Sequence, residues 1–276
     1  LQEKLRRVFH QYGFEDIETP TFEYFEVFSK EVGTIPSRDL YKFFDREGNT
    51  LVLRPDFTPS VSRACATYFN PEKEVVSLCY TGNTFINNSS FRGRLKETTQ
   101  MGVERMGDDS PEADAEILAM TVECLLATGL TEFQVSVGQV DYYKAIFAQT
   151  GLSQEEEEEL RELISQKNYF GVEELVKNKN MDKSLARVLS QLPQMFGSTE
   201  VLEKAKSLTD NPQALKAVAR LEEIYELLKV YGYEKYVTFD FAMLSKYHYY
   251  TGIIFQAYTY GTGEPLIKGG RYNEKR

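Results

Sequence analysis

The chain has 276 residues, of which 42% are hydrophobic and 27% are charged, as is typical of an ordered globular protein. Its 42 acidic residues outnumber the 32 basic ones, and the net charge of −10 argues against broad binding to nucleic acid or to an anionic membrane surface. No apolar run approaches the length of a membrane span, so we expect no membrane partner. The chain begins at Leu1 and not at Met, which leaves room for a segment before it.

The cysteines and histidines indicate a protein without metal or covalent chemistry. Cys65, Cys79 and Cys124 stand far apart without metal-ligand spacing, and their odd number is typical of buried thiols in a reducing cytoplasm. His10 and His248 are too few for a histidine-based zinc site or a Ser/His relay. We therefore predict a cytoplasmic protein with no metal and no cofactor.

Helix and strand patterns alternate over the first half of the chain. Apolar residues at helical spacing predict a helix over residues 1–12, which Gly13 ends. Later patterns predict, in order, a strand broken at Pro20, a short aromatic helix, a hairpin turning at residues 46–49, a helix capped by Thr58, a hairpin over residues 80–104, a helix over residues 110–129 and a strand over residues 131–139.

The pattern then changes to helices only, from about Tyr142 to Tyr231, and strand character returns at residue 232. We predict an α+β fold, a mostly antiparallel sheet flanked by helices and interrupted by a helical module. The predicted parts are a core formed by residues 1–141 and 232–276, with an insertion of residues 142–231.

Five segments in order resemble the catalytic core of the histidyl-tRNA synthetase family, which belongs to the class II aminoacyl-tRNA synthetases. These segments are "ETPTFEYFEVFSKEVG", "LRPDFTPSVSRACA", "YTGNTF" with "GRLKETTQMGVE", "SPEADAEILA" and "HYYTGIIFQAY" with "GGRY". The order of several segments is specific, whereas any one alone is weak. The resemblance implies the class II fold.

Two departures from that family change the expected function. The family carries an arginine directly after the phenylalanine of "YTGNTF" and a glutamate two residues later, where this chain has Ile86 and Asn88. A second essential arginine falls on Ser245, next to Lys246. Ile86 cannot replace a guanidinium that neutralises a phosphate. The three positions Ile86, Asn88 and Ser245 therefore indicate lost synthetase function.

With these losses the chain resembles the regulatory subunits of ATP phosphoribosyltransferase, which are paralogues of the synthetase. That resemblance implies no catalytic residue in this chain. It implies a short-form ATP phosphoribosyltransferase catalytic subunit as partner, L-histidine as feedback effector, and self-association to a homodimer through the segment "ETPTFEYFE". The partner would catalyse the first step of histidine biosynthesis.

The resemblance also implies the residues that bind the histidine effector. They are Asp56, Thr58, Gln100, Glu104, Tyr249, Tyr250, Arg271 and Tyr272. Alternative interpretations remain for several: Thr58 as a helix cap, Gln100 and Glu104 as a solvated sheet face, and the tyrosines as aromatic core.

Several groups are candidates to bind the carboxylate of the effector. They are Arg54, Arg94, Lys246, Arg271, backbone amides and a residue of a partner chain. Two rival functions also stay open at this point. One is a divergent histidyl-tRNA synthetase-like enzyme that activates an amino acid, and the other is a histidine-binding module with a different partner.

Overall fold

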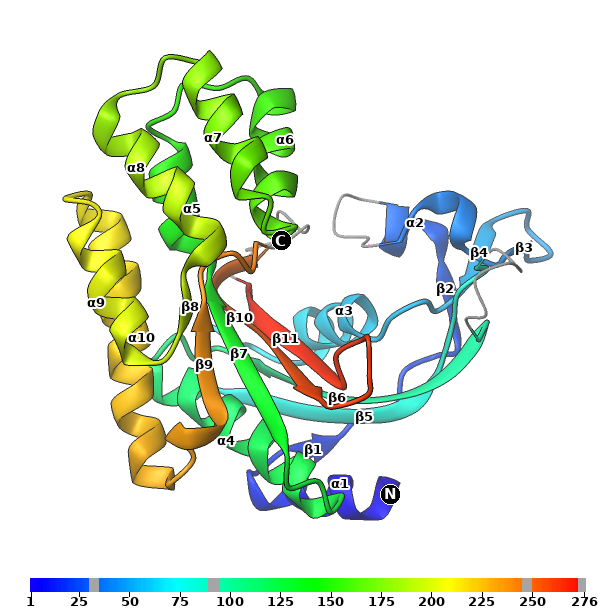
Figure 1. The fold of residues 1–276 in the computed structure, drawn as a ribbon. Helices are drawn as coiled ribbons and strands as arrows, with labels where there is room; N and C mark the ends of the chain where they lie inside the picture. Colours follow the sequence, from blue (N-terminus) through cyan, green and yellow to red (C-terminus); the bar gives the residue numbers. More distant parts are fainter. Residues whose placement is uncertain (30–34, 89–94, 245–249, 273–276) are drawn as a thin grey trace. The chain divides into compact units, whose positions relative to one another are not determined.

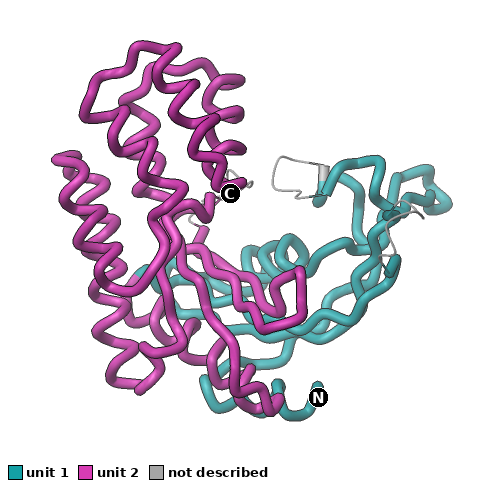
Figure 2. The backbone as a smooth tube through the Cα atoms, in the orientation of Figure 1, with its two compact units in different colours: residues 1–109 teal, residues 110–276 magenta. Residues whose placement is uncertain are grey.

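The computed structural model describes residues 1–29, 35–88, 95–244 and 250–272 (Figure 1). The backbone divides into two compact units, residues 1–109 and residues 110–276 (Figure 2). Each unit has its own strands, helices and hydrophobic core. The predicted α+β fold is confirmed by this arrangement.

Unit 1 contains two three-stranded sheets, with strand orders β1-β5-β6 and β2-β4-β3. Strand β1 is parallel to β5, whereas the other neighbouring strands of these two sheets are antiparallel. The elements are α1 (Gln2–Gln11), β1 (Glu15–Asp16), β2 (Phe22–Tyr24), α2 (Phe25–Ser29), η1 (Ser37–Asp39), β3 (Lys42–Phe44), β4 (Thr50–Leu53), α3 (Thr58–Tyr68), β5 (Val76–Phe85) and β6 (Glu97–Met106).

The long hairpin β5–β6 confirms the prediction made from the stretch at residues 80–104. Its two strands pair over ten residues each, from Val76 opposite Met106 to Phe85 opposite Glu97. Helix α3 packs on one face of it, where Phe57 and Val61 form a buried cluster with strand residues such as Tyr80. The apolar side chains of α3 thereby hold the polar start of this helix over the hairpin.

The small sheet β2-β4-β3 buries one face and exposes the other. Val52 on the middle strand is fully buried in a cluster with Phe28 and Leu40. On the opposite face, Phe22 and Tyr24 are 51% and 55% exposed. Alternation along a strand sends neighbouring residues to opposite faces, so one layer of aromatic side chains is left uncovered in this chain.

Unit 2 is built on one five-stranded sheet with strand order β11-β10-β7-β9-β8, in which only the pair β7–β9 is parallel. Its elements are α4 (Pro111–Ala127), β7 (Phe133–Gln139), α5 (Val140–Phe147), α6 (Gln154–Ser165), α7 (Tyr169–Asn178), α8 (Lys183–Gln191), η3 (Leu192–Gln194), β8 (Phe196–Gly197), α9 (Thr199–Ser207), α10 (Pro212–Tyr231), η4 (Glu234–Tyr236), β9 (Val237–Asp240), β10 (Tyr250–Thr259) and β11 (Ile267–Tyr272).

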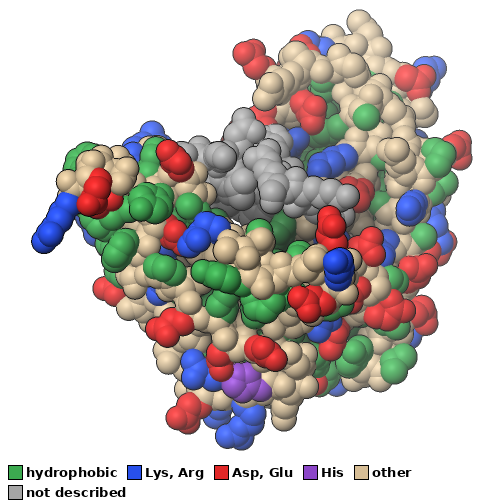
Figure 3. Space-filling view, turned by 180° about the vertical axis from the view of Figure 1, so that it is seen from behind, with side chains coloured by type: hydrophobic (Ala, Val, Ile, Leu, Met, Phe, Trp, Pro, Cys, Tyr) green, Lys and Arg blue, Asp and Glu red, His purple; other side chains and the backbone are tan. Residues whose placement is uncertain are grey.

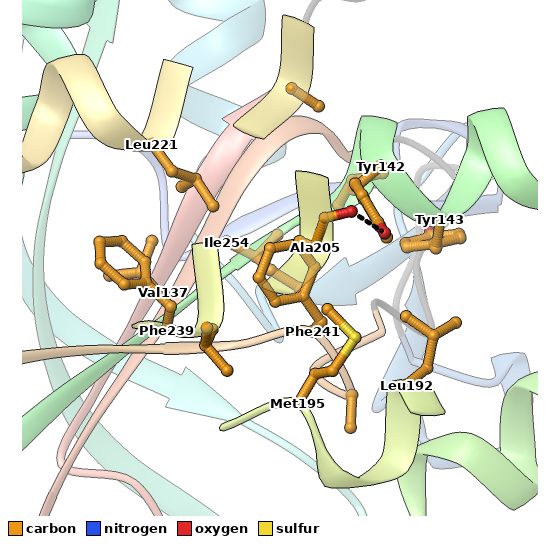
Figure 4. Close-up of a cluster of buried hydrophobic side chains, with 14 of the residues drawn as sticks. Val137, Tyr142, Tyr143, Leu192, Met195, Ala205, Leu221, Phe239, Phe241 and Ile254 are labelled. Carbon is orange, nitrogen blue, oxygen red and sulfur yellow. Dashed lines mark hydrogen bonds between the residues drawn. The ribbon is translucent and has the colours of Figure 1, made fainter. Parts of the chain in front are cut away.

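The core of unit 2 joins the sheet to its helices in one cluster (Figure 4). Tyr142 is fully buried there, and its hydroxyl donates a hydrogen bond to the carbonyl oxygen of Ala205 over 3.1 Å. Its ring meets that of Phe241 edge to face at a centroid distance of 4.8 Å. Burial raises the pKa of the Tyr142 hydroxyl, which therefore stays protonated and can donate to the carbonyl.

The sequence patterns predicted most of these elements correctly. Ser110 caps α4 through a hydrogen bond from the Ala113 amide, and Ser153 and Glu156 form the expected capping box of α6. The expectation of helices only from Tyr142 to Tyr231 is wrong at the two-residue strand β8. The two compact units meet between residues 109 and 110. The division into residues 1–141, 142–231 and 232–276 stays a prediction.

The expectation of buried cysteine thiols is confirmed. The three cysteines are free and buried, and burial raises the pKa of both Cys79 and Cys124 to about 12. No helix in the described part of the chain combines the length and the apolar character that crossing a bilayer requires. On the face shown in Figure 3, basic side chains are scattered among acidic ones, in keeping with the net charge of −10.

Candidate functional site

The register of the hairpin β5–β6 places Gln100 and Glu104 on one face, as predicted. Gln100 lies opposite Gly82, and Glu104 lies opposite Leu78. Residues two and four apart on a strand point to the same side, and directly paired residues do so as well. This is the face on which α3 packs.

Tyr80 fills the space between Gln100 and Glu104. It lies opposite Gly102, where an added Cβ atom would be only 2.3 Å from the tyrosine oxygen. The ring of Tyr80 is 5% exposed and stacks on Phe57 at a centroid distance of 4.4 Å. Gly102 is therefore needed so that the hydroxyl of Tyr80 can reach across the second strand.

The start of helix α3 completes this group and corrects one expectation. Thr58 is the first helical residue, and its hydroxyl donates a hydrogen bond to Oε1 of Glu104 over 2.7 Å. The prediction that Thr58 caps the helix is wrong. The N-cap residue is Phe57, without a side-chain cap, and Oδ1 of Asp56 before it accepts hydrogen bonds from the amides of Phe57 and Thr58 at 2.7 and 3.4 Å. The Thr58 side chain is thus directed to the strand.

These side chains form one electrostatic group. Burial first, and then the carboxylates of Glu104 and Asp56, raise the pKa of Tyr80 well above its usual value. Hydrogen bonds with Thr58 and Gln100 oppose that rise. The hydroxyl of Tyr80 therefore stays neutral beside two carboxylates. Carboxylates and neutral oxygen atoms are the acceptors that an ammonium or an imidazole N–H requires. We call Asp56, Thr58, Tyr80, Gln100 and Glu104 the acidic cluster.

Arg54 donates to backbone carbonyl oxygens, and its role toward the effector carboxylate stays a prediction. Its guanidinium is 7% exposed and donates to the carbonyl oxygens of Asn83 and Thr19, each at 2.8 Å. The guanidinium also lies over the ring of Phe57, 4.1 Å from its centroid. Gly82 makes room for it, since a Cβ there would be 2.5 Å from the Arg54 nitrogen. Burial lowers the pKa of Arg54.

The positions that suggested lost synthetase function lie directly after β5. The amide of Ile86 donates to the carbonyl oxygen of Lys96 at 2.9 Å, which extends the hairpin by one pair. The side chain of Asn88 donates to the carbonyl oxygen of Leu95 at 3.3 Å. Neither side chain carries a charge. The third position, Ser245, lies outside the described residues.

In unit 2, the predicted tyrosines and glycines lie on the paired strands β10 and β11. Tyr250 lies opposite Tyr272. A Cβ on Gly270 would be 2.7 Å from the ring of Tyr250, and one on Gly269 would be 2.3 Å from the ring of Phe255. These glycines thus accommodate aromatic rings of the neighbouring strand.

Arg271 pairs with a carboxylate that the sequence reasoning did not single out. Its Nε and Nη2 atoms lie 2.8 and 2.7 Å from Oδ1 of Asp114 on α4. Oδ2 of the same Asp114 accepts from Nε of Arg220 on α10 at 2.9 Å. Asp114 is 5% exposed, so both arginines share one buried carboxylate. This ion pair gives Arg271 a structural role.

The predicted site residues therefore fall into two sets that belong to different units. Asp56, Thr58, Gln100 and Glu104 meet in unit 1, whereas Tyr250, Tyr272 and Arg271 belong to unit 2. Tyr249 lies outside the described residues. Sequence reasoning missed Tyr80, although a glycine between Gln100 and Glu104 is the signal of a large side chain opposite.

Comparisons with known proteins identify the family and one of its members with a similar sequence. The family model for histidyl-tRNA synthetase matches residues 1–275. The ATP phosphoribosyltransferase regulatory subunit of Acetivibrio thermocellus is 41% identical over 273 residues, which are 99% of this chain and 65% of that protein. The chain thus spans just under two thirds of the length of that relative.

Two solved structures share the fold. A Bacillus halodurans protein described as an ATP phosphoribosyltransferase regulatory subunit/histidyl-tRNA synthetase has a TM-score of 0.88 and 33% identity, over 98% of this chain and 70% of that one. The ATP phosphoribosyltransferase complex HisG:HisZ of Thermotoga maritima contains a chain with a TM-score of 0.72 and 20% identity, over 100% of this chain and 93% of that one. This second likeness concerns the fold alone.

The sequence relatives and the matching fold agree with the residue chemistry of the hairpin. The hairpin pairs β5 with β6, and the replacement of a charged pair by Ile86 and Asn88 stays a prediction from the sequence resemblance. The chain belongs to the histidyl-tRNA synthetase family and, within it, to the ATP phosphoribosyltransferase regulatory subunits.

Proposed function

We propose that this chain acts as a non-catalytic regulatory subunit of ATP phosphoribosyltransferase in the cytoplasm. In this role it binds a short-form catalytic subunit, which carries out the first step of histidine biosynthesis. It is needed for the activity of that partner and makes the activity sensitive to feedback inhibition by L-histidine. The names of its relatives and the family to which it belongs support this assignment.

The observation that carries the proposal is the contrast between the two ends of one hairpin. At the end of β5, Ile86 and Asn88 offer no positive charge to a phosphate. An uncharged aliphatic side chain cannot stabilise the charge that develops during adenylate formation, and loss of one such contact commonly lowers a rate by roughly a hundred- to a thousand-fold. Further along β6, the acidic cluster keeps acceptors that suit an amino acid.

The acidic cluster is proposed to hold the histidine effector. Glu104 is placed to accept an N–H of the imidazole, and Asp56 and Gln100 to meet the α-amino group. Thr58 orients Glu104 through its 2.7 Å hydrogen bond, which fixes one carboxylate oxygen. The further assignment of Tyr249, Tyr250, Arg271 and Tyr272 to the same effector stays a prediction from the family resemblance.

Reconstitution with a short-form catalytic subunit tests the proposal. The partner alone should form phosphoribosyl-ATP from ATP and phosphoribosyl pyrophosphate slowly, the mixture should form it faster, and L-histidine should inhibit only the mixture. Activity of the partner that does not respond to the chain would contradict the regulatory role.

A second assay separates this proposal from the rival enzyme. A divergent amino-acid-activating enzyme would catalyse histidine-dependent exchange between pyrophosphate and ATP. We expect no exchange above background, because two of the positions that would hold the nucleotide carry Ile86 and Asn88. Clear exchange that depends on histidine would overturn the proposal.

A further inference from the structure

Three potential metal ligands meet on the side of unit 1 that carries α1. His10 lies at the end of α1, Asp16 on β1 and Cys79 on β5. One ligand atom from each lies within 4.8 Å of the other two. Residue spacing does not predict this group, because Cys79 is 63 residues from Asp16 and the usual spacing of metal-binding cysteines is absent.

Hydrogen bonds already connect the three side chains, with Asp16 in contact with both His10 and Cys79. Nε2 of His10 lies 2.9 Å from Oδ2 of Asp16, and Sγ of Cys79 donates to Oδ1 of Asp16 over 3.6 Å. Ligand atoms around a tetrahedral zinc ion, bound at about 2.0–2.3 Å, are separated by roughly 3.3–3.8 Å. Displacements of about an ångström or less would therefore convert this hydrogen-bonded group into a coordination shell.

The three side chains differ in their exposure to solvent. Cys79 is 1% exposed, so its sulfur lies at the bottom of the group. The side chains of His10 and Asp16 are 47% and 51% exposed and form the outer edge. His10 also lines an open depression on α1 together with Glu3, Arg6, Arg7 and Gln11. The side chains of His10 and Asp16 are thus open to an ion from solvent.

One cation competes for the same carboxylate. Nε of Arg6 lies 3.3 Å from Oδ1 of Asp16, and both side chains are half exposed. An exposed pair of this kind contributes little to stability. Coordination of a divalent ion by a thiolate, an imidazole and a carboxylate is much stronger, so Arg6 can be displaced into solvent.

We propose that His10, Asp16 and Cys79 bind one divalent transition-metal ion of the zinc class. The ion binds Nε2 of His10, a carboxylate oxygen of Asp16 and the thiolate of Cys79, and water occupies the fourth position. Binding releases the thiol proton of Cys79 to solvent. Mixed nitrogen, oxygen and sulfur ligands favour zinc, cobalt or copper over magnesium or calcium. The ion joins the end of α1 to the strands β1 and β5.

Cobalt titration of the protein tests the site, because a Co²⁺–thiolate bond absorbs strongly in the near ultraviolet. We expect this absorption to saturate at one equivalent of Co²⁺ and to disappear when Zn²⁺ is added. Cys79→Ser should abolish it. Cys65→Ser is the matched control, since Cys65 is an equally buried thiol in the same unit and lies in the α3 cluster. That variant should keep the full absorption.

His10→Ala keeps the test decisive if Cys79→Ser fails to fold, because His10 is half exposed on a helix. Its affinity for Zn²⁺, measured by competition with a chelator, should fall by at least about ten-fold, since loss of even an outer-shell partner has that effect. Zn²⁺ should also raise the melting temperature of the unmodified protein more than that of His10→Ala. Absence of the thiolate absorption, its survival in Cys79→Ser, or unchanged Zn²⁺ affinity in His10→Ala would each overturn the proposal.

Discussion

At the scale of single residues, Gly102 and Tyr80 determine the arrangement of the acidic cluster beside α3. The absent side chain at Gly102 lets the hydroxyl of Tyr80 lie over the second strand, between Gln100 and Glu104. The stack of Tyr80 on Phe57 holds the ring in that place. Packing therefore positions the acidic cluster, because the stacked rings of Tyr80 and Phe57 support its carboxylates.

Glu104→Gln tests the role of this carboxylate in effector binding. We expect the dissociation constant for L-histidine, measured by calorimetry, to rise by roughly ten- to a hundred-fold, since a hydrogen bond to a charged group contributes about 1.5–3 kcal/mol. The amide can still contact Thr58, so the fold should be retained.

Glu97→Gln is the matched control for that substitution. Glu97 lies on the same strand, but an odd number of residues away, so it points to the other face, where it accepts from Asn83 at 2.6 Å. Its change should leave histidine binding as it was. Equal weakening by both substitutions would show that general charge, and not the acidic cluster, holds the effector.

At the scale of elements, the carboxylate of Asp114 joins three parts of unit 2. It lies in the first turn of α4 and bonds to Arg220 on α10 and to Arg271 on β11. Among the described strands, β11 lies at the edge of its sheet and pairs with β10, so this ion pair is a second attachment for it. The network thus positions the strand that carries Tyr272.

Asp114→Asn should destabilise the protein strongly. Removing one member of a buried charge network typically costs about 3–5 kcal/mol, because the remaining charges lose their partner, although Asn keeps part of the hydrogen bonding. The measurement is the urea midpoint of unfolding, which should fall. Asp210→Asn, at an exposed position before α10, is the control and should change stability by less than about 0.5 kcal/mol. Similar midpoints for the two variants would refute a structural role for Asp114.

At the scale of the whole molecule, the uncovered face of the sheet β2-β4-β3 is the surface on which we expect the chain to associate with a second copy. Phe22 and Tyr24 project from β2, and Phe43 from β3 meets Phe22 edge to face at 5.7 Å. Tyr24 and Phe43 both pair with Leu51, so all three aromatic side chains share one face. Burial of such a face against its copy would remove apolar area from water.

Tyr24→Glu should shift the protein from dimer to monomer in sedimentation velocity at a fixed concentration, because it buries a charge in an apolar contact. Phe44→Glu is the matched control. Phe44 is 73% exposed, but it lies one residue from Phe43 and therefore on the opposite face. It should leave the mass unchanged. A monomeric parent protein, or equal effects of the two changes, would rule out this surface as the dimer contact.

Much of the local structure was predictable because local signals determine it. Ser110 and Ser153 start helices through contacts three residues away, and Gly13, Gly48 and Gly129 adopt positive φ at turns. The boundary of α3 was misjudged by one residue, since both Asp56 and Thr58 are good capping residues. Strand β8 was missed because two residues carry no periodicity.

The sequence by itself determined the family and the α+β class, because these depend on residue identity and on order along the chain. Only the tertiary structure decided which side chains meet. Thr58 contacts Glu104 over a separation of 46 residues, and Arg271 contacts Asp114 over 157. Periodicity assigns a side chain to a face, but packing of that face against another element selects its partner. For this reason, neither the place of Tyr80 in the acidic cluster nor the contacts of Arg54 with backbone carbonyl oxygens could be predicted from the sequence.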